Sequence, residues 1–263
     1  MNVNTAASEN VYGHRKKLDY IKRTIVSFAG QDISRLKVLD FGCGNGTAVS
    51  FELASLGVDL TGFDFHHPSI EYARMHGPAN AEFICGTLED LKTTFDVIVC
   101  ADVIEHLPQP KQILQYLRRL HRTGGILIAV VPNGVGPFEL ENKLPKYLDT
   151  PQLAGYILDI FFKSRRRLFG IPPPPDPGLA FADIPYNAES GHVQFFRLKD
   201  IRTLAAEGGY RIVEAKSGIF LGSPAFSAHF MQYSKRLIRW NTVVADHLPL
   251  RFVSTWYFTW EAV

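Results

Sequence analysis

The sequence predicts an α/β fold, in which helices cover both faces of a parallel sheet. Strand-like apolar runs alternate with helix-like runs five times between residues 31 and 132, and the turns between them are short. The first strand-like run ends in a glycine-rich stretch at residues 42–46, and polar residues follow the later runs. Ligands of such sheets bind at the carboxyl ends of the strands, so we expect a ligand site at this edge.

The individual elements follow from their residue patterns. β-branched and aromatic residues between turn signals predict strands at 38–41, 58–64, 81–85, 95–101, 126–131, 210–215 and 250–263. Apolar residues at helical spacing predict helices at 12–29, 47–56, 110–122, 197–207 and 226–247, with a further helix that begins at Pro68. The strand at 95–101 is almost entirely apolar, which is typical of a central strand.

The composition is that of a globular protein with a hydrophobic core. Of the 263 residues, 46% are apolar and 21% are charged. A net charge of +2 gives no indication of nucleic-acid binding. The sequence has neither an apolar run long enough to span a membrane nor a signal-peptide core, so we expect a cytoplasmic protein. Cys43, Cys85 and Cys100 lack metal or redox spacing; we expect reduced thiols near strand ends, gathered around one cleft.

The stretch from Val38 to Gly46 predicts a strand, a tight turn and the start of a helix. Such a corner binds nucleotides, because a helix N-terminus offers free N–H groups. Thr47 stands where the dinucleotide fingerprint has its third glycine. Asp40, placed before the turn, would repel a pyrophosphate but suits a cation. Both residues therefore disfavour a nicotinamide-dependent oxidoreductase, which remains an alternative.

Two motifs resemble a known family. VLDFGCGNG, residues 38–46, resembles motif I of the class I S-adenosylmethionine-dependent methyltransferases. DVIEHL, residues 102–107, resembles the run after strand four in their small-molecule and quinone O-methyltransferase-like branch. The resemblance is strong over residues 36–132 and loose over 191–263. It implies a Rossmann-like, doubly wound, seven-stranded sheet, mostly parallel, with an antiparallel last strand between strands five and six, and S-adenosyl-L-methionine as the cofactor.

The resemblance also assigns residues to the cofactor. Asp64 ends the second expected strand, 20 residues after Gly44, and is expected to bind the ribose hydroxyls; capping the next helix is its alternative role. Phe65 and His66 are expected to flank the adenine. Thr87 stands near the position where many members carry an acidic residue. The expected cofactor-binding set is Tyr12, Asp40, Gly42, Cys43, Gly44, Asp64, Phe65, His66, Thr87, Leu88, Ala101, Asp102 and Val103.

Two histidines are the expected catalytic residues. A hydroxyl acceptor is a poor nucleophile until it loses its proton, and histidine titrates near neutral pH. His106 follows strand four, close to the expected place of the transferred methyl group, whereas His192 would have to fold back onto the cleft. A structural role is the alternative for each. Glu105 could orient His106 or bind a metal, but the sequence offers no convincing ligand set, so no metal is expected.

The regular alternation of strands and helices ends after strand five. The intervening residues are too many for a plain connection, and their aromatic content favours a packed lid over the acceptor. We expect helices at 138–148 and 152–168 and an extended proline-rich run at 171–177. The expected organisation is an N-terminal helix at 1–30, a cofactor-binding half at 31–132, a lid insertion at 133–196 and a C-terminal half at 197–263.

The expected function is methyl transfer from S-adenosylmethionine to a small-molecule or lipid-linked acceptor, with oxygen as the expected acceptor atom. A non-catalytic binding module that keeps the fold is a second alternative. The aromatic residues between 239 and 260 could touch a membrane surface, although packing of the closing strand explains them more simply. No nucleic-acid partner is expected, and the sequence leaves the acceptor and the oligomeric state open.

Overall fold

The computed structural model describes residues 9–30, 32–141, 191–222 and 234–263, together with residues 160, 164, 184, 185, 187 and 231. A helix begins at Pro137, and its described part ends at Glu141. The remainder of the helix expected at 138–148, the proline-rich run at 171–177 and nearly all of the helix expected at 152–168 lie outside the described residues. Residues 226–230, 232 and 233 of the helix expected at 226–247 also lie outside the described residues.

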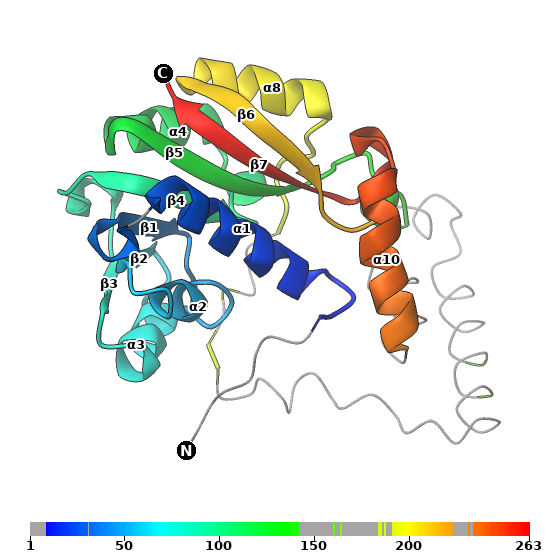
Figure 1. Cartoon of the computed structure of the whole chain (residues 1–263), viewed down its shortest axis with the longest axis horizontal. Coiled ribbons are helices and arrows are strands. Elements are labelled where there is room, and N and C mark those ends of the chain that lie inside the picture. The colour runs from blue at the N-terminus through cyan, green and yellow to red at the C-terminus, as the bar shows by residue number, and fades with distance from the viewer. Residues whose placement is uncertain are drawn as a thin grey trace.

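The described residues form one seven-stranded sheet (Figure 1). The strand order is β3-β2-β1-β4-β5-β7-β6. Strands β1 to β5 are parallel, whereas β7 is antiparallel to both of its neighbours, β5 and β6. The expected sheet, including the antiparallel last strand, is therefore confirmed. The strands are β1 Lys37–Phe41, β2 Asp59–Asp64, β3 Ala81–Cys85, β4 Phe95–Ala101, β5 His121–Pro132, β6 Tyr210–Ser217 and β7 Thr255–Ala262.

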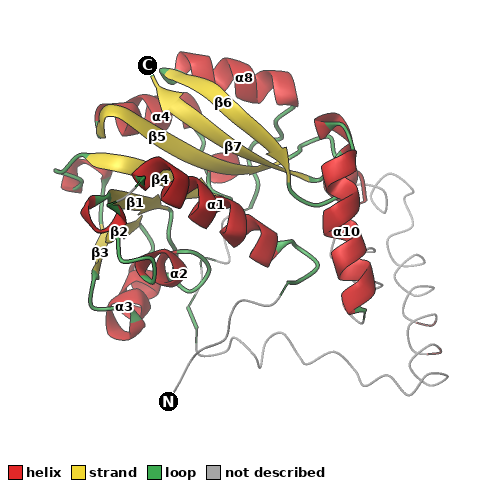
Figure 2. Cartoon of the chain, in the orientation of Figure 1, coloured by secondary structure: helices red, strands yellow, loops and turns green. Residues whose placement is uncertain are grey.

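Helices cover both faces of the sheet, as the doubly wound fold requires (Figures 1 and 2). The longer described helices are α1 His14–Ala29, α2 Ser50–Ala54, α3 His67–His76, α4 Pro110–Arg119, α8 Leu198–Glu207 and α10 Lys235–His247. Helices α1 and α2 share one hydrophobic core with one face of the sheet, in which Ile21 and Leu53 are fully buried. Helices α4 and α8 share the opposite core, in which Leu117 and Ile201 are fully buried. No described helix is long and apolar enough to span a bilayer.

Strand β7 carries much of the aromatic core. Trp256, Phe258 and Trp260 are buried on the α4 and α8 side. The side chain of Tyr257 points to the other face, toward α1, because successive side chains of a strand alternate. These tail residues are therefore core residues. The structure leaves others exposed: Trp240 of α10 is 47% exposed.

Helix α2 is shorter than the sequence predicts. The pattern predicts a helix from residue 47, but the observed helix begins at Ser50. Gly46 has a φ of 78°, which a right-handed helix does not allow, and Asn45 Oδ1 accepts hydrogen bonds from the backbone N and hydroxyl of Thr47. Turns therefore occupy residues 45–49, so the glycine stretch leads into α2 through an irregular segment rather than directly.

The cysteines do not gather around one cleft. Cys43 and Cys85 pack in a small cluster with Ile70 and Phe83, whereas Cys100 lies in the large core next to α4 and α8. Burial raises the pKa of the Cys43 and Cys100 thiols. The three cysteines are free, and the two buried ones pack as small apolar side chains.

Candidate active site

The glycine-rich loop is attached to β2 and open on its outer side. The backbone N–H groups of Gly42 and Cys43 both donate to the Phe63 carbonyl, at 2.8 and 3.0 Å. Gly42 and Gly44 have left-handed backbones, with φ of 76° and 55°. No atom lies within 4 Å of the place where a Cβ of Gly44 would stand. The loop therefore leaves open space beside Gly44, where a ligand can approach the backbone closely.

Asp64 is fixed at the carboxyl end of β2, beside this loop. Its Oδ2 accepts a hydrogen bond from the Gly44 N–H at 2.8 Å, and its Oδ1 accepts one from the His66 N–H at 2.8 Å. The residue is only 9% exposed. Two backbone donors thus orient the carboxylate, and each oxygen retains a lone pair that can accept a further hydrogen bond.

Asp40 lies in β1, two residues before the loop, and is buried. Its Oδ2 accepts a hydrogen bond from the Ser50 hydroxyl at 2.5 Å, which connects β1 to the start of α2. Burial raises the pKa of Asp40 to about 6, against the opposing effects of the Ser50 hydroxyl and the Lys17 ammonium. In this position Asp40 supports the loop from within and adds negative charge under it.

The other residues expected around the cofactor lie at the same edge of the sheet, in different roles. Phe65 is 70% exposed, and the His66 Nδ1 is 2.7 Å from the Ser69 hydroxyl. Thr87 caps the short helical turn that contains Leu88, and its side chain bonds to Asp90. This bond occupies the Thr87 hydroxyl within its own turn.

Three expected residues lie at the carboxyl end of β4: Ala101 is its last residue, and Asp102 and Val103 follow it. Asp102 has a φ of 57°, a left-handed conformation that aspartate tolerates better than most residues. Its carboxylate forms an ion pair with the ammonium of Lys17 on α1 at 2.6 Å. This pair links the N-terminal helix to the end of β4. Sequence reasoning gave Lys17 no role in the site.

A cavity of about 240 Å³ adjoins the end of β4 and is lined by both predicted catalytic histidines. Its walls come from α1, from the turn after β4, from β5 and β7, and from the two described ends of the segment 133–196. The lining residues are Tyr12, Lys17, Asp102, Glu105, His106, Val130, Pro132, Phe138, His192, Ile219, Ser254, Thr255 and Tyr257. His192 thus folds back beside His106, 86 positions earlier in the sequence.

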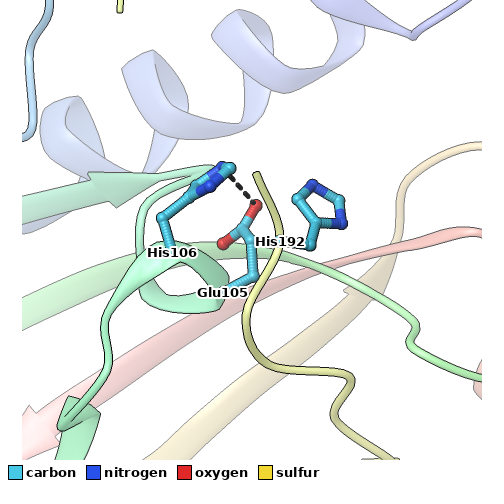
Figure 3. Close-up of side chains that lie close together, drawn as sticks. All are labelled: Glu105, His106 and His192. Carbon is cyan, nitrogen blue, oxygen red and sulfur yellow. Dashed lines mark ion pairs between the residues drawn. The ribbon is translucent and has the colours of Figure 1, made fainter. Parts of the chain in front are cut away.

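Each histidine is held through its Nδ1, and Figure 3 shows the two rings on either side of Glu105. His106 Nδ1 lies 3.1 Å from the Gly191 carbonyl, and His192 Nδ1 lies 3.1 Å from Oε1 of the buried Glu139. The two ring centroids are 5.0 Å apart. Because a carbonyl and a carboxylate accept hydrogen bonds, each Nδ1 carries a proton and each Nε2 is left as the basic nitrogen. Sequence reasoning missed Glu139, since no local pattern pairs it with a histidine 53 residues away.

Glu105 lies beneath the two histidines and is 1% exposed. Its backbone carbonyl accepts hydrogen bonds from the N–H groups of Val193 and Gln194, both at 3.0 Å, which ties the segment around His192 to the turn after β4. Its side-chain Oε1 is 3.9 Å from His106 Nε2. Burial, followed by the nearby Asp102 carboxylate, raises the pKa of Glu105 well above its usual range.

These features define an α/β protein with a nucleotide-type ligand site. They are the strand order, the glycine loop that is hydrogen-bonded to Asp64 at the end of β2, and the cavity at the same edge of the sheet. A family model described as a methyltransferase domain matches residues 12–215. The chain therefore belongs to this methyltransferase family, and the resemblance to the class I S-adenosylmethionine-dependent methyltransferases is confirmed.

Curated relatives include two enzymes named Ubiquinone biosynthesis O-methyltransferase. The one from Rickettsia canadensis is 32% identical over 148 residues, which cover 54% of this chain and 58% of the relative. The one from Xanthomonas oryzae pv. oryzae is 31% identical over 118 residues, or 42% of this chain and 46% of the relative. The chain thus spans about half the length of the curated relatives that it matches.

Solved structures share the fold at low sequence identity. Magnesium protoporphyrin IX methyltransferase from Synechocystis PCC 6803, with bound SAH, gives a TM-score of 0.54 at 15% identity, over 100% of this chain and 89% of that one. The 4+2 cyclase SpnF gives 0.54 at 13% identity, over 93% and 81%. A methyltransferase and a cyclase therefore share this architecture, so the reaction must be inferred from the site.

Proposed function

We propose that the chain is an S-adenosylmethionine-dependent methyltransferase that methylates a hydroxyl oxygen of a small-molecule acceptor. One observation carries the proposal: a carboxylate oriented by the glycine loop lies at the same sheet edge as a cavity that contains two oriented histidines. Membership of the methyltransferase family supports it, and the names of the curated relatives favour oxygen as the acceptor atom.

The residues at the glycine loop fit the cofactor. S-adenosylmethionine supplies an electrophilic methyl group on a sulfonium. The free lone pairs of Asp64 suit two ribose hydroxyls, because a carboxylate accepts several hydrogen bonds. The open backbone at Gly44 allows close approach. Negative charge at Asp40 and Asp102 favours a cationic ligand over a pyrophosphate, which argues against the nicotinamide alternative.

The cavity at the end of β4 suits the acceptor. Phe138, Ile219 and Tyr257 provide apolar walls, while His106 and His192 provide the polar groups. A hydroxyl becomes a good nucleophile when its proton is removed or weakened, so we assign the two histidines to that task. Binding in this cavity also positions the hydroxyl, which can contribute much of the rate.

The insertion between strands five and six is proposed to close the acceptor site. Its described ends place Phe138, Glu139 and His192 at the cavity. The carbonyl of Pro185, within the same segment, accepts hydrogen bonds from Asn45 of the glycine loop and from Ser69. The segment thus contacts both the acceptor cavity and the cofactor loop, as a lid over the two would.

The cofactor assignment is tested by Asp64→Asn. The amide keeps the size of the carboxylate but removes its charge, and one of its N–H₂ donors must then face the backbone N–H of Gly44 or His66. A hydrogen bond to a charged group contributes about 1.5–3 kcal/mol, so the affinity for S-adenosylmethionine should fall roughly 10- to 100-fold in isothermal titration calorimetry.

The matched control is Asp59→Asn, at the other end of the same strand β2 and exposed to solvent. This variant should bind the cofactor as the wild type does. A wild type that does not bind S-adenosylmethionine contradicts the proposal, as does an equal loss in both variants. Transfer of a labelled methyl group to a panel of small phenols then tests the reaction itself, and absence of transfer to any acceptor would favour the non-catalytic module.

A further inference from the structure

We propose that Glu105, His106 and His192 form a binding site for a divalent transition-metal ion in the acceptor cavity. Each of the three residues offers one donor atom, and these atoms all lie within 4.8 Å of one another. Figure 3 shows the three side chains converging from the turn after β4 and from the segment before α8. The role of the ion in catalysis rests on the proposed function, whereas its binding does not.

The distances are close to those of a metal-binding site. His106 Nε2 and Glu105 Oε1 lie 3.9 Å apart. A tetrahedral ion bound at about 2.0–2.2 Å to nitrogen and oxygen ligands holds the ligand atoms roughly 3.4 Å apart. Small side-chain rotations would therefore bring the donors together around an ion, without movement of the strands that carry them.

Both imidazoles are oriented as metal ligands commonly are. A ligating histidine usually donates its second N–H to a carboxylate or a backbone carbonyl, which fixes the ring and leaves the other nitrogen for the metal. His192 has the carboxylate of Glu139 in that position, and His106 has the carbonyl of Gly191, each at 3.1 Å. Nε2 of each histidine is the available ligand atom. Glu139, 5% exposed, is thus a positioning residue for His192.

The third donor is a buried acid with one unpartnered oxygen. Among the described residues, Oε2 of Glu105 has no hydrogen-bond partner. In the part of the chain that the structure describes, the charged groups that act on Glu105 are the acids Asp102 and Glu139 and the cation Lys17, which is itself paired with Asp102. A buried polar atom without a partner costs free energy. A bound cation would supply both the missing partner and a further positive charge.

The ligand types indicate the class of ion. Two imidazoles and one carboxylate suit Zn²⁺, Fe²⁺ or Co²⁺, whereas Mg²⁺ and Ca²⁺ prefer oxygen ligands. Three protein ligands leave a coordination position open toward the cavity, as in catalytic zinc sites. With the ion bound, both Nε2 atoms are ligands, so the histidines would act on the acceptor through the ion and not as free bases. An acceptor hydroxyl that occupies the open position would lose its proton to water more readily, because the ion lowers the pKa of the hydroxyl. The methyl group would then pass to that oxygen while the carbon–sulfur bond breaks and its electron pair stays on sulfur.

Metal titrations of the purified chain, stripped with chelator, test the site without any acceptor. Co²⁺ should produce visible absorption bands with a stoichiometry of one, and Zn²⁺ should displace them. His106→Ala, His192→Ala and Glu105→Gln should each weaken Co²⁺ binding by at least about 100-fold. Glu139→Gln, which removes only the support of His192, should weaken it about 10- to 100-fold. The matched control His67→Ala changes an exposed histidine on α3 and should leave binding unchanged.

The possible results separate this inference from the proposed function. A wild type that binds neither Co²⁺ nor Zn²⁺ at millimolar concentration overturns the site, and so do ligand variants that keep their circular-dichroism spectrum and bind Co²⁺ like the wild type. Methyl transfer that persists in full after chelation would overturn the catalytic role of the ion while the proposed function stands. Stoichiometric metal binding that depends on the three ligands supports the site even if no methyl transfer occurs.

Discussion

At the scale of single residues, Gly42 shows why the glycine loop has this sequence. Its φ of 76° lies in the left-handed region, which residues with a Cβ rarely adopt. A Cβ at this position would also stand 2.6 Å from Cγ2 of Val103, the residue that packs under the loop from the end of β4. Both the backbone and the space therefore require glycine, and the loop is fitted to the chain segment that carries the site.

The variant Gly42→Ala should be markedly less stable than a glycine-to-alanine variant that introduces backbone strain without a steric clash. Left-handed backbone costs about 1–2 kcal/mol for a residue with a Cβ, and overpacking a filled site adds about 1–3 kcal/mol. Gly57→Ala is the matched control, because Gly57 has a φ of 82° but open space around its Cβ position. Urea unfolding should show a loss of about 2–5 kcal/mol for the first and about 1–2 kcal/mol for the second. Equal losses would mean that Val103 moves aside freely.

Single residues also show how far the site could be predicted. Asp64 is found from sequence because the end of a strand is marked by its apolar pattern, and parallel strands end at one edge. The proximity of His106 and His192 cannot be predicted from the sequence, since it depends on a chain reversal through the long segment between β5 and α8. Glu139 has no sequence signal either, because its pairing with His192 is a tertiary contact. Patterns thus indicate candidate residues, and the fold decides which of them meet.

At the scale of elements, β7 is the strand on which the second half of the sheet depends. It pairs with β5 on one side and β6 on the other, and its side chains enter both cores. The sequence predicts a strand across 250–263, but the observed strand begins at Thr255. Residues Leu250–Phe252 instead form a short helical turn after Pro249. As with α2, the type of element is predictable while its boundary is set by local turn geometry.

Phe258→Ala tests the role of β7 in stability. The side chain is 1% exposed and packs between Trp256 and Trp260. Removing a buried phenylalanine costs about 3–5 kcal/mol through lost burial and the cavity left behind. Phe252→Ala, at a position that is 47% exposed, is the control and should cost less than about 1 kcal/mol. Chemical denaturation measures both, and a small loss for Phe258→Ala would show that the neighbouring strands do not depend on β7.

At the scale of the whole molecule, buried titratable groups determine how stability varies with pH. Burial, aided by Arg118, lowers the pKa of His121 to about 4 from 6.5, and burial raises the pKa of Asp40 to about 6 from 3.8. His121 stabilises the fold above pH 6.5, and this contribution is lost as the pH falls through 4. Asp40 acts in the opposite sense: its contribution is complete below pH 3.8 and is lost as the pH rises through 6. Between pH 4 and 6 the two partly cancel.

The variant His121→Phe should therefore separate the two contributions. His121 is buried beside Tyr210, and neither of its ring nitrogens has a hydrogen-bond partner among the described residues, so a phenyl ring fits the site without leaving a polar group unpaired. As the pH falls from 6.5 towards 4, the imidazole takes up a proton in the unfolded wild type but not in the folded one, which lowers the stability of the wild type; the variant lacks this group. A pKa difference of this size corresponds to about 2–3 kcal/mol between pH 7.5 and 4.5. Urea unfolding at the two pH values should show the stability of the variant relative to the wild type rising by that amount toward pH 4.5. A constant difference would mean that His121 titrates alike in the folded and unfolded chain.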